Sequence, residues 1–231
     1  MLRLDQVVLV QDDFRLTADW QVELGARVAI IGPSGAGKST LLSAIAGFFA
    51  PTSGAIRWQG RDLAKVQPGD RPVSILFQDQ NLFPHLTLAQ NLGLGLRPDL
   101  KLTQEQIGQV ETALTRVGLA GLGSRRPAQL SGGQLGRAAL ARALLRARPV
   151  LLLDEPFAAL GPALKAEMLA LVAEVAAENG ATVLMVTHDP RDAQGFADQT
   201  VLVADGVAAA PVATEVLFAN PPVALAAYLG R

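Results

Sequence analysis

Apolar residues occur along the chain in two patterns, short uninterrupted runs and longer stretches with helical spacing. The runs at 27–31, 150–153 and 183–186 lack polar alternation, as expected for strands buried on both faces of a sheet. Helical spacing over residues 162–179 predicts an amphipathic helix, which Gly180 is placed to end. Because such strands and helices alternate, we predict an α/β fold with a mostly parallel sheet covered by helices on both faces.

The beginning, middle and end of the chain have different patterns of apolar residues. Two apolar runs at 2–10 and 14–22 predict antiparallel N-terminal β strands, and residues 201–206 predict a final hairpin. Between residues 86 and 147, Leu and Ala recur at helical spacing, with a helix start at Thr103. We interpret this stretch as an inserted helical subdomain. The expected organisation is a single domain over residues 1–231, with a core at 1–84 and 148–231 and the helical subdomain at 85–147.

Composition and charge narrow the classes of function. The 231 residues are 50% hydrophobic and contain no cysteine, which excludes disulfides, thiolate metal sites and a cysteine nucleophile. The formal net charge of -1 gives no reason to expect nucleic acid as a partner. We see no secretory signal and no apolar run near the roughly 20 residues that span a bilayer. Contact with a membrane is therefore expected through a partner.

A glycine-rich segment between a predicted strand and a predicted helix carries the first chemical signal. It fits G-x-x-x-x-G-K-[ST], in which backbone N–H groups and the helix N-terminus surround phosphate. Lys38 supplies a mobile charge for the β- and γ-phosphates, and the Ser39 hydroxyl is a ligand for Mg²⁺. The alternative, a chance glycine turn, is disfavoured by the flanking strand and helix. The predicted loop residues are Gly32, Pro33, Ser34, Gly35, Ala36, Gly37, Lys38, Ser39 and Thr40.

Two carboxylates follow the apolar strand at 150–153. The carboxyl ends of strands in open α/β sheets face the ligand crevice, so Asp154 is suited to orient Mg²⁺. Glu155, one residue further on, is suited to act as the general base for an attacking water. The alternative is a strand capped by solvated acids, which the phosphate loop makes less favourable.

The segment Leu130-Ser131-Gly132-Gly133-Gln134 lies between these two motifs. Alone, it could be a turn that starts the following helix, with Ser131 near the cap. With Gln78 upstream and His188 downstream, however, the ordered set resembles the nucleotide-binding subunit of ATP-binding-cassette transporters over essentially the whole chain. The resemblance implies a RecA-like P-loop NTPase core, ATP and Mg²⁺ as ligands, and ATP hydrolysis coupled to transport.

The resemblance also implies roles for single residues. Gln78 would touch Mg²⁺ or the lytic water and sense a membrane partner, and His188 would contact the γ-phosphate as a catalytic residue with Glu155. The signature residues would contact ATP held by a second copy of the chain, giving an ATP-sandwiched homodimer. The segment 78–88 would dock on transmembrane permease subunits at the cytoplasmic face of the bacterial inner membrane, with a solute-binding protein as an indirect partner. These signature residues are Ser131, Gly132, Gly133 and Gln134.

Three positions depart from the family pattern. Gly161 replaces an aspartate that helps to join the two active sites, which puts subunit coupling and turnover in doubt. Leu135-Gly136 replace polar residues, and a helix-interior glycine costs about 1 kcal/mol relative to alanine, so the first turns of that helix are expected to be softer. The adenine-stacking aromatic is Phe14, or less favourably Trp20, with a core role for Phe14 as the alternative.

The overall run of residues looks most like bacterial thiamine-importer ATPases. The similarity lies mainly in residues 71–78, 91–96 and 201–206. The resemblance implies an importer subunit whose cargo is thiamine or thiamine phosphates. The alternatives are an importer ATPase for a different small solute or ion, a soluble ABC ATPase outside transport, and a regulatory subunit with little hydrolysis.

Overall fold

The computed structural model describes residues 1–78, 81–158 and 160–230. The strands are β1 (Leu2–Gln11), β2 (Phe14–Val22), β3 (Arg27–Ile31), β4 (Ser53–Trp58), β5 (Arg61–Asp62), β6 (Val73–Leu76), β7 (Val150–Asp154), β8 (Thr182–Val186), β9 (Gln199–Ala204), β10 (Val207–Ala208) and β11 (Val212–Ala213). The helices are α1 (Lys38–Ala46), α2 (Leu88–Gly93), α3 (Gln104–Arg116), α4 (Gly132–Leu145), α5 (Pro162–Asn179), α6 (Pro190–Phe196), α7 (Thr214–Ala219) and α8 (Val223–Tyr228).

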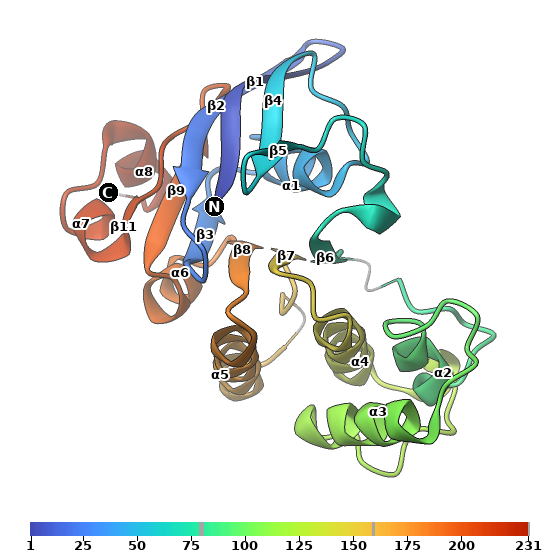
Figure 1. Ribbon diagram of the computed structural model, residues 1–231. Coiled ribbons are helices and arrows are strands. Elements are labelled where there is room, and N and C mark those ends of the chain that lie inside the picture. The colour runs from blue at the N-terminus through green and yellow to red at the C-terminus, as the bar shows by residue number, and fades with distance from the viewer. Residues whose placement is uncertain (79–80, 159, 231) are drawn as a thin grey trace.

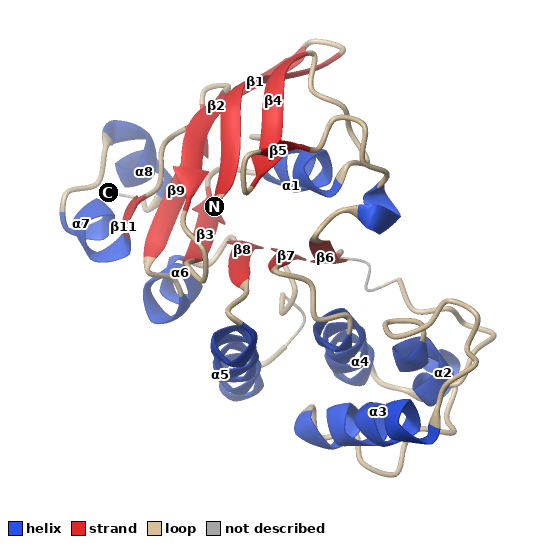
Figure 2. Cartoon of the chain, in the orientation of Figure 1, coloured by secondary structure: helices blue, strands red, loops and turns tan. Residues whose placement is uncertain are grey.

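The strands join in one sheet that has a parallel and an antiparallel part (Figure 2). The order is β5-β4-β1-β2-β10-β9-β3-β8-β7-β6, with β11 also paired to β9. Strands β9, β3, β8, β7 and β6 run parallel, whereas β1, β2, β4 and β5 pair antiparallel. The short β10 links the two parts, because it pairs with both β2 and β9. The predicted mostly parallel core and antiparallel N-terminal strands are confirmed.

The parallel strands are buried on both faces, which explains their uninterrupted apolar runs. In β3, Val28 and Ile30 pack into a cluster with α1 and the antiparallel strands. Their neighbours Ala29 and Ile31 pack into a second cluster with α4 and α5. Because successive side chains of a strand point to opposite faces, both faces must be apolar. Figure 1 shows α4 and α5 on one side of these strands and α1 on the other.

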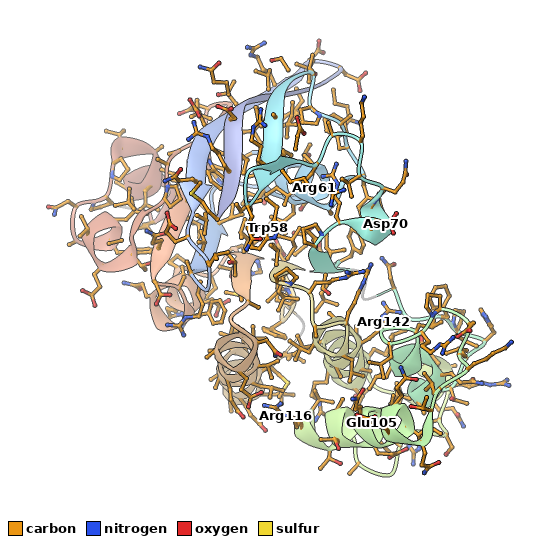
Figure 3. All side chains as sticks on the ribbon, in the orientation of Figure 1. Trp58, Arg61, Asp70, Glu105, Arg116 and Arg142 are labelled. Atoms are coloured by element: carbon orange, nitrogen blue, oxygen red, sulfur yellow. The ribbon has the colours of Figure 1, made fainter. Side chains whose placement is uncertain are left out.

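Helices α2, α3 and α4 gather at the end of the molecule away from the antiparallel strands (Figure 1). Thr103 is the N-cap of α3 and forms the expected reciprocal capping pair with Gln106. Arg116, at the end of α3, forms ion pairs with Glu174 and Glu178 of α5, and Figure 3 shows it beside that helix. The proposed subdomain boundaries at 85 and 147 remain a prediction.

The C-terminal helices α7 and α8 lie on the β9 side of the sheet, in red in Figure 1. Leu217 of α7 and Leu225 of α8 are buried in the same cluster as α4 and α5. Within the described residues, none of the helices combines the length and the apolarity needed to cross a membrane.

Candidate active site

The phosphate loop connects β3 to α1 and holds the Lys38 side chain inside its curve. Lys38 Nζ donates hydrogen bonds of 2.8 Å to the carbonyl oxygens of Gly32 and Pro33. Gly35 and Gly37 have φ angles of 78° and 97°, which are left-handed conformations that favour glycine. Helix α1 begins at Lys38, so its positive N-terminal end faces the loop. This arrangement of backbone and ammonium group can bind phosphate.

Asp154 ends β7 next to the start of α1. The Ser39 hydroxyl donates a 3.0 Å hydrogen bond to Asp154 Oδ1, which brings two of the three predicted metal ligands together. Burial raises the pKa of Asp154, and the neighbouring Glu155 adds to this effect. Burial lowers the pKa of Lys38, although Glu155 and Asp154 oppose that shift. A hydroxyl and a carboxylate are oxygen ligands that suit Mg²⁺, which usually completes its shell with phosphates and water.

Glu155 and His188 face one another across the ends of β7 and β8. Glu155 Oε2 lies 3.2 Å from His188 Nδ1. The φ angle of Glu155 is 46°, an uncommon conformation for a residue with a side chain. Such strained residues cluster at active sites, where the surrounding structure holds them in place. Here the Glu155 N–H donates a 3.1 Å hydrogen bond to the Val186 carbonyl of β8.

A groove of about 270 Å³ lies over the phosphate loop. Phe14, at the start of β2, lies against Gly37, since a Cβ atom built on Gly37 would overlap the end of the Phe14 ring. The half-buried Phe14 therefore lies beside the phosphate loop, and its stacking on a base remains a prediction. Trp20, the less favoured candidate, is buried and donates to the Ala208 carbonyl instead. The groove is lined by Gln11, Phe14, Ser34, Gly35, Gly37, Lys38, Ser39, Thr40 and Glu155.

The signature residues lie at the N-terminus of α4. Ser131 is the N-cap and forms a reciprocal capping pair with Gln134, at 3.3 Å and 2.9 Å. Ser131 and Gly132 are exposed, and in the described residues neither lines the groove over the phosphate loop. Gln78 is also exposed, in the turn after β6. The structure thus brings together the loop, both carboxylates and His188, whereas the signature residues lie outside the groove over the phosphate loop.

Helix α4 continues through Gly136, which is buried. Gly161 is the exposed N-cap of α5 and supplies no side-chain cap to that helix. Asp79 and Gln80 of the predicted docking segment, and Ala159 just before Leu160 and Gly161, lie outside the described residues.

Two groups beside the site were not found by motif analysis. Gln11 lines the groove from the end of β1. Lys165 of α5 lies 3.0 Å from Asp189 Oδ2 and 2.8 Å from Asp192 Oδ1, so it ties α5 to the segment that follows His188. The only sequence signal for Gln11 is that a polar residue follows the apolar run of the first predicted strand, just before the turn to the second. An isolated lysine on a helix gives no signal for such a contact.

A larger cleft of about 700 Å³ lies elsewhere, between α3, α4 and α5. Its lining contains none of the residues of the phosphate loop, neither of the carboxylates Asp154 and Glu155, and not His188. Size alone therefore does not identify the site, and we assign it from the convergence of phosphate loop, carboxylates and histidine.

Comparison with known proteins identifies the family. The sequence profile of a family described as ABC transporter matches residues 17–158, which is more than half of the chain. The chain therefore belongs to the ABC transporter family. The fold agrees: the dimeric structure of a post-hydrolysis state of the ATP-binding cassette MJ0796 bound to ADP and Pi has a TM-score of 0.82 and 28% identity, covering 93% of this chain and 99% of that chain. The predicted family and fold class are confirmed.

The curated relatives narrow the similarity further. The Thiamine import ATP-binding protein ThiQ of Cereibacter sphaeroides (strain ATCC 17023) is 68% identical over 230 residues, covering 100% of both chains. The protein of the same name from Ruegeria sp. (strain TM1040) is 56% identical over 230 residues, again covering 100% of both. The predicted similarity to thiamine-importer ATPases is thus confirmed over the whole length of the chain.

Proposed function

We propose that this chain is the ATP-binding and ATP-hydrolysing subunit of a membrane importer for thiamine or thiamine phosphates. The main support is the contact of the Ser39 hydroxyl with Asp154 at 3.0 Å, because it joins the phosphate loop to the end of β7, which Glu155 directly follows. The cargo assignment rests on the relatives named for thiamine import, of which one is 68% identical. An importer for another solute is the alternative that shares this site.

The residues of the loop bind and orient ATP. The phosphates accept hydrogen bonds from the loop backbone and the N-terminus of α1. Lys38 exchanges its bonds to the loop carbonyls for bonds to the β- and γ-phosphates. Ser39 and Asp154 would hold Mg²⁺, with Gln78 as a further ligand, and the bound ion would supply positive charge to stabilise the phosphates. The Phe14 ring stacks on adenine at the outer end of the groove.

Glu155 and His188 act on the γ-phosphate. The Glu155 carboxylate accepts a proton from a water molecule while the water oxygen bonds to the γ-phosphorus. The bond between that phosphorus and the β-γ bridging oxygen breaks at the same time. His188, which lies 3.2 Å from Glu155, contacts the γ-phosphate and orients it for this attack. A general base of this kind contributes about 10²–10⁴-fold to the rate.

A second copy of the chain completes each site. Helix α4 is 14 residues long, and its exposed N-terminus is capped by Ser131 and begins with two glycines that admit close approach of an anion. We propose that it seals ATP bound to the opposite copy. The two dimeric MJ0796 structures support this arrangement, with TM-scores of 0.82 and 0.81.

Permease subunits dock beside Gln78. Phe48 and Phe83 are 59% and 46% exposed, and exposed aromatic side chains are common anchors of protein interfaces. Phe48 packs against Phe77, the residue before Gln78, at 5.6 Å between ring centroids. Docking there places the chain at the cytoplasmic face of the bacterial inner membrane. A solute-binding protein on the other face delivers the cargo.

The test is phosphate release by the chain assembled with its permease in proteoliposomes. Thiamine with its binding protein should stimulate release, Lys38→Ala should abolish ATP binding, and Glu155→Gln should bind ATP but lose about 10²-fold or more of the rate. The matched control is Glu167→Gln, an exposed position of α5, which should keep the wild-type rate. Equal rates for Glu155→Gln and the wild type would overturn the mechanism, and stimulation by another solute alone would overturn the cargo.

The homodimer has its own measurement. Glu155→Gln with saturating ATP and Mg²⁺ should form dimers in analytical ultracentrifugation, because the sealed nucleotide is not hydrolysed. A Glu155→Gln chain that binds ATP yet remains monomeric would contradict the shared site.

A further inference from the structure

The backbone of His188 is held by a residue from the far C-terminal helix. The Tyr228 hydroxyl, on α8, donates a 2.6 Å hydrogen bond to the His188 carbonyl oxygen. This distance is at the short end of the range for O–H···O bonds. Forty residues separate the two positions, so the bond is made by the packing of α8 against the core.

Tyr228 is a fixed donor. Its ring packs on the core cluster that also contains Leu225, which is fully buried on the same helix. Burial raises the pKa of Tyr228, and the carboxylates of Glu155 and Asp189 raise it further. The hydroxyl therefore stays protonated at neutral pH and remains available to donate.

His188 itself has little packing to hold it. Its side chain is 60% exposed, and its ring contacts Glu155 Oε2 at 3.2 Å. The following residue, Asp189, is fixed by the 3.0 Å ion pair with Lys165. An exposed histidine on a loop can adopt several rotamers, because little packing selects one of them. Where the ring of His188 lies relative to the γ-phosphate therefore depends on the position of its backbone.

We propose that Tyr228 is a positioning residue for His188, which it orients through the carbonyl bond while touching no substrate itself. The inference rests on the proposed role of His188 at the γ-phosphate. Because the hydroxyl acts on orientation during hydrolysis, its loss should lower kcat more than it changes the KM for ATP.

The first test is Tyr228→Phe in the full-length chain, which removes the hydroxyl and keeps the ring. We expect kcat to fall by about fivefold, the effect of one lost hydrogen bond, with KM within about twofold. The melting temperature should change by less than about 4 °C, which separates this effect from unfolding. The matched control is Val223→Ala, an 88% exposed position of the same helix, which should keep the wild-type kcat. A Tyr228→Phe kcat within about 1.5-fold of wild type would overturn the proposal, whatever the folding stability of the variant.

A double-mutant cycle tests whether the effect passes through His188. In single-turnover assays of a His188→Ala chain, Tyr228→Phe should lower the rate by less than about 1.5-fold. The same fivefold loss in that background would overturn the proposal. This result can be separated from a failure of the proposed function. An inactive wild-type chain would refute the function. If the wild type is active and Glu155→Gln is impaired, the function stands and the assays test the role of Tyr228 alone.

Nuclear magnetic resonance gives a readout that is independent of turnover. The chain has only two histidines, so His188→Ala assigns both ring signals. Tyr228→Phe should move or broaden the ring signal of His188 and leave that of His85 unchanged. An unchanged His188 signal would overturn the proposal.

Discussion

Two glycines of the phosphate loop differ in what an added Cβ atom would meet, which makes them a useful pair for testing the structure. Gly35 and Gly37 both have left-handed φ angles, of 78° and 97°. A Cβ atom at Gly35 meets nothing within 4 Å, whereas one at Gly37 overlaps Phe14 Cζ and lies 2.9 Å from Phe14 Cε2. Alanine at position 35 thus tests backbone conformation alone, and alanine at position 37 adds a steric clash with the aromatic ring.

The expected losses follow from these two effects. A left-handed conformation costs an L-residue about 1–2 kcal/mol, so Gly35→Ala should lower the free energy of unfolding by that amount. Overpacking adds about 1–3 kcal/mol, and the half-buried Phe14 ring can relieve part of it by swinging toward solvent. We therefore expect Gly37→Ala to lose about 1 kcal/mol more than Gly35→Ala. The displaced ring should also weaken ATP binding.

Urea unfolding without nucleotide measures these losses, with the fluorescence of the buried Trp20 and Trp58 as the signal. Phe14→Leu shortens the obstructing side chain, so the Phe14→Leu/Gly37→Ala chain should lose only the backbone cost when compared with Phe14→Leu. Equal losses at both glycines, or no recovery in the Phe14→Leu background, would refute the placement of Phe14 against the loop.

Three further substitutions give distinct outcomes. Burial raises the pKa of Asp154 in the folded chain, so ionisation of this carboxyl destabilises the fold once the pH exceeds that pKa. In urea titrations, Asp154→Asn should therefore raise the free energy of unfolding by about 1 kcal/mol at pH 7 and leave it unchanged at pH 3. The same substitution should abolish Mg²⁺-dependent hydrolysis. Lys165→Met should lower the free energy of unfolding by about 1–2 kcal/mol at pH 7. Hydrogen bonds from Arg191 and Lys165 lower the pKa of Asp189, so the difference between variant and wild type should shrink in thermal unfolding below about pH 4. Gly161→Asp should add an N-cap to α5, where φ is -66° and space is open, and stabilise by about 0.3 kcal/mol while increasing phosphate release.

Features with a local cause could be predicted from the sequence. The strand, glycine loop and helix around Lys38 lie where the sequence pattern predicted them. Helix α1 begins at Lys38, however, three residues before the apolar spacing that starts at Leu41. The motif residues Lys38, Ser39 and Thr40 form its first turn, which apolar spacing cannot reveal. The cap at Thr103 and the end at Gly180 were also predictable, because capping depends on neighbouring residues.

Features that join distant parts of the chain could not be predicted. Arg71 is buried and donates to the carbonyls of Ala44 and Ile45 at the end of α1, at 3.0 Å and 2.8 Å. The sequence around Arg71 contains no sign of that helix end. The hairpin of β9 and β10 was predicted from residues 201–206, but the pairing of β10 with β2 was not, because a two-residue strand carries too little pattern to indicate a distant partner. Such contacts depend on the tertiary fold.

The sheet topology explains why one chain presents only part of a catalytic site. Strands β3, β8, β7 and β6 are parallel neighbours, so the segments that follow them emerge at one edge of the sheet. Those segments carry the phosphate loop, His188, Glu155 and Gln78. The signature residues instead begin α4, which follows a loop and not a strand, so the fold gives them no place at that edge. Completion of the site by a second copy is thus consistent with the order of the strands.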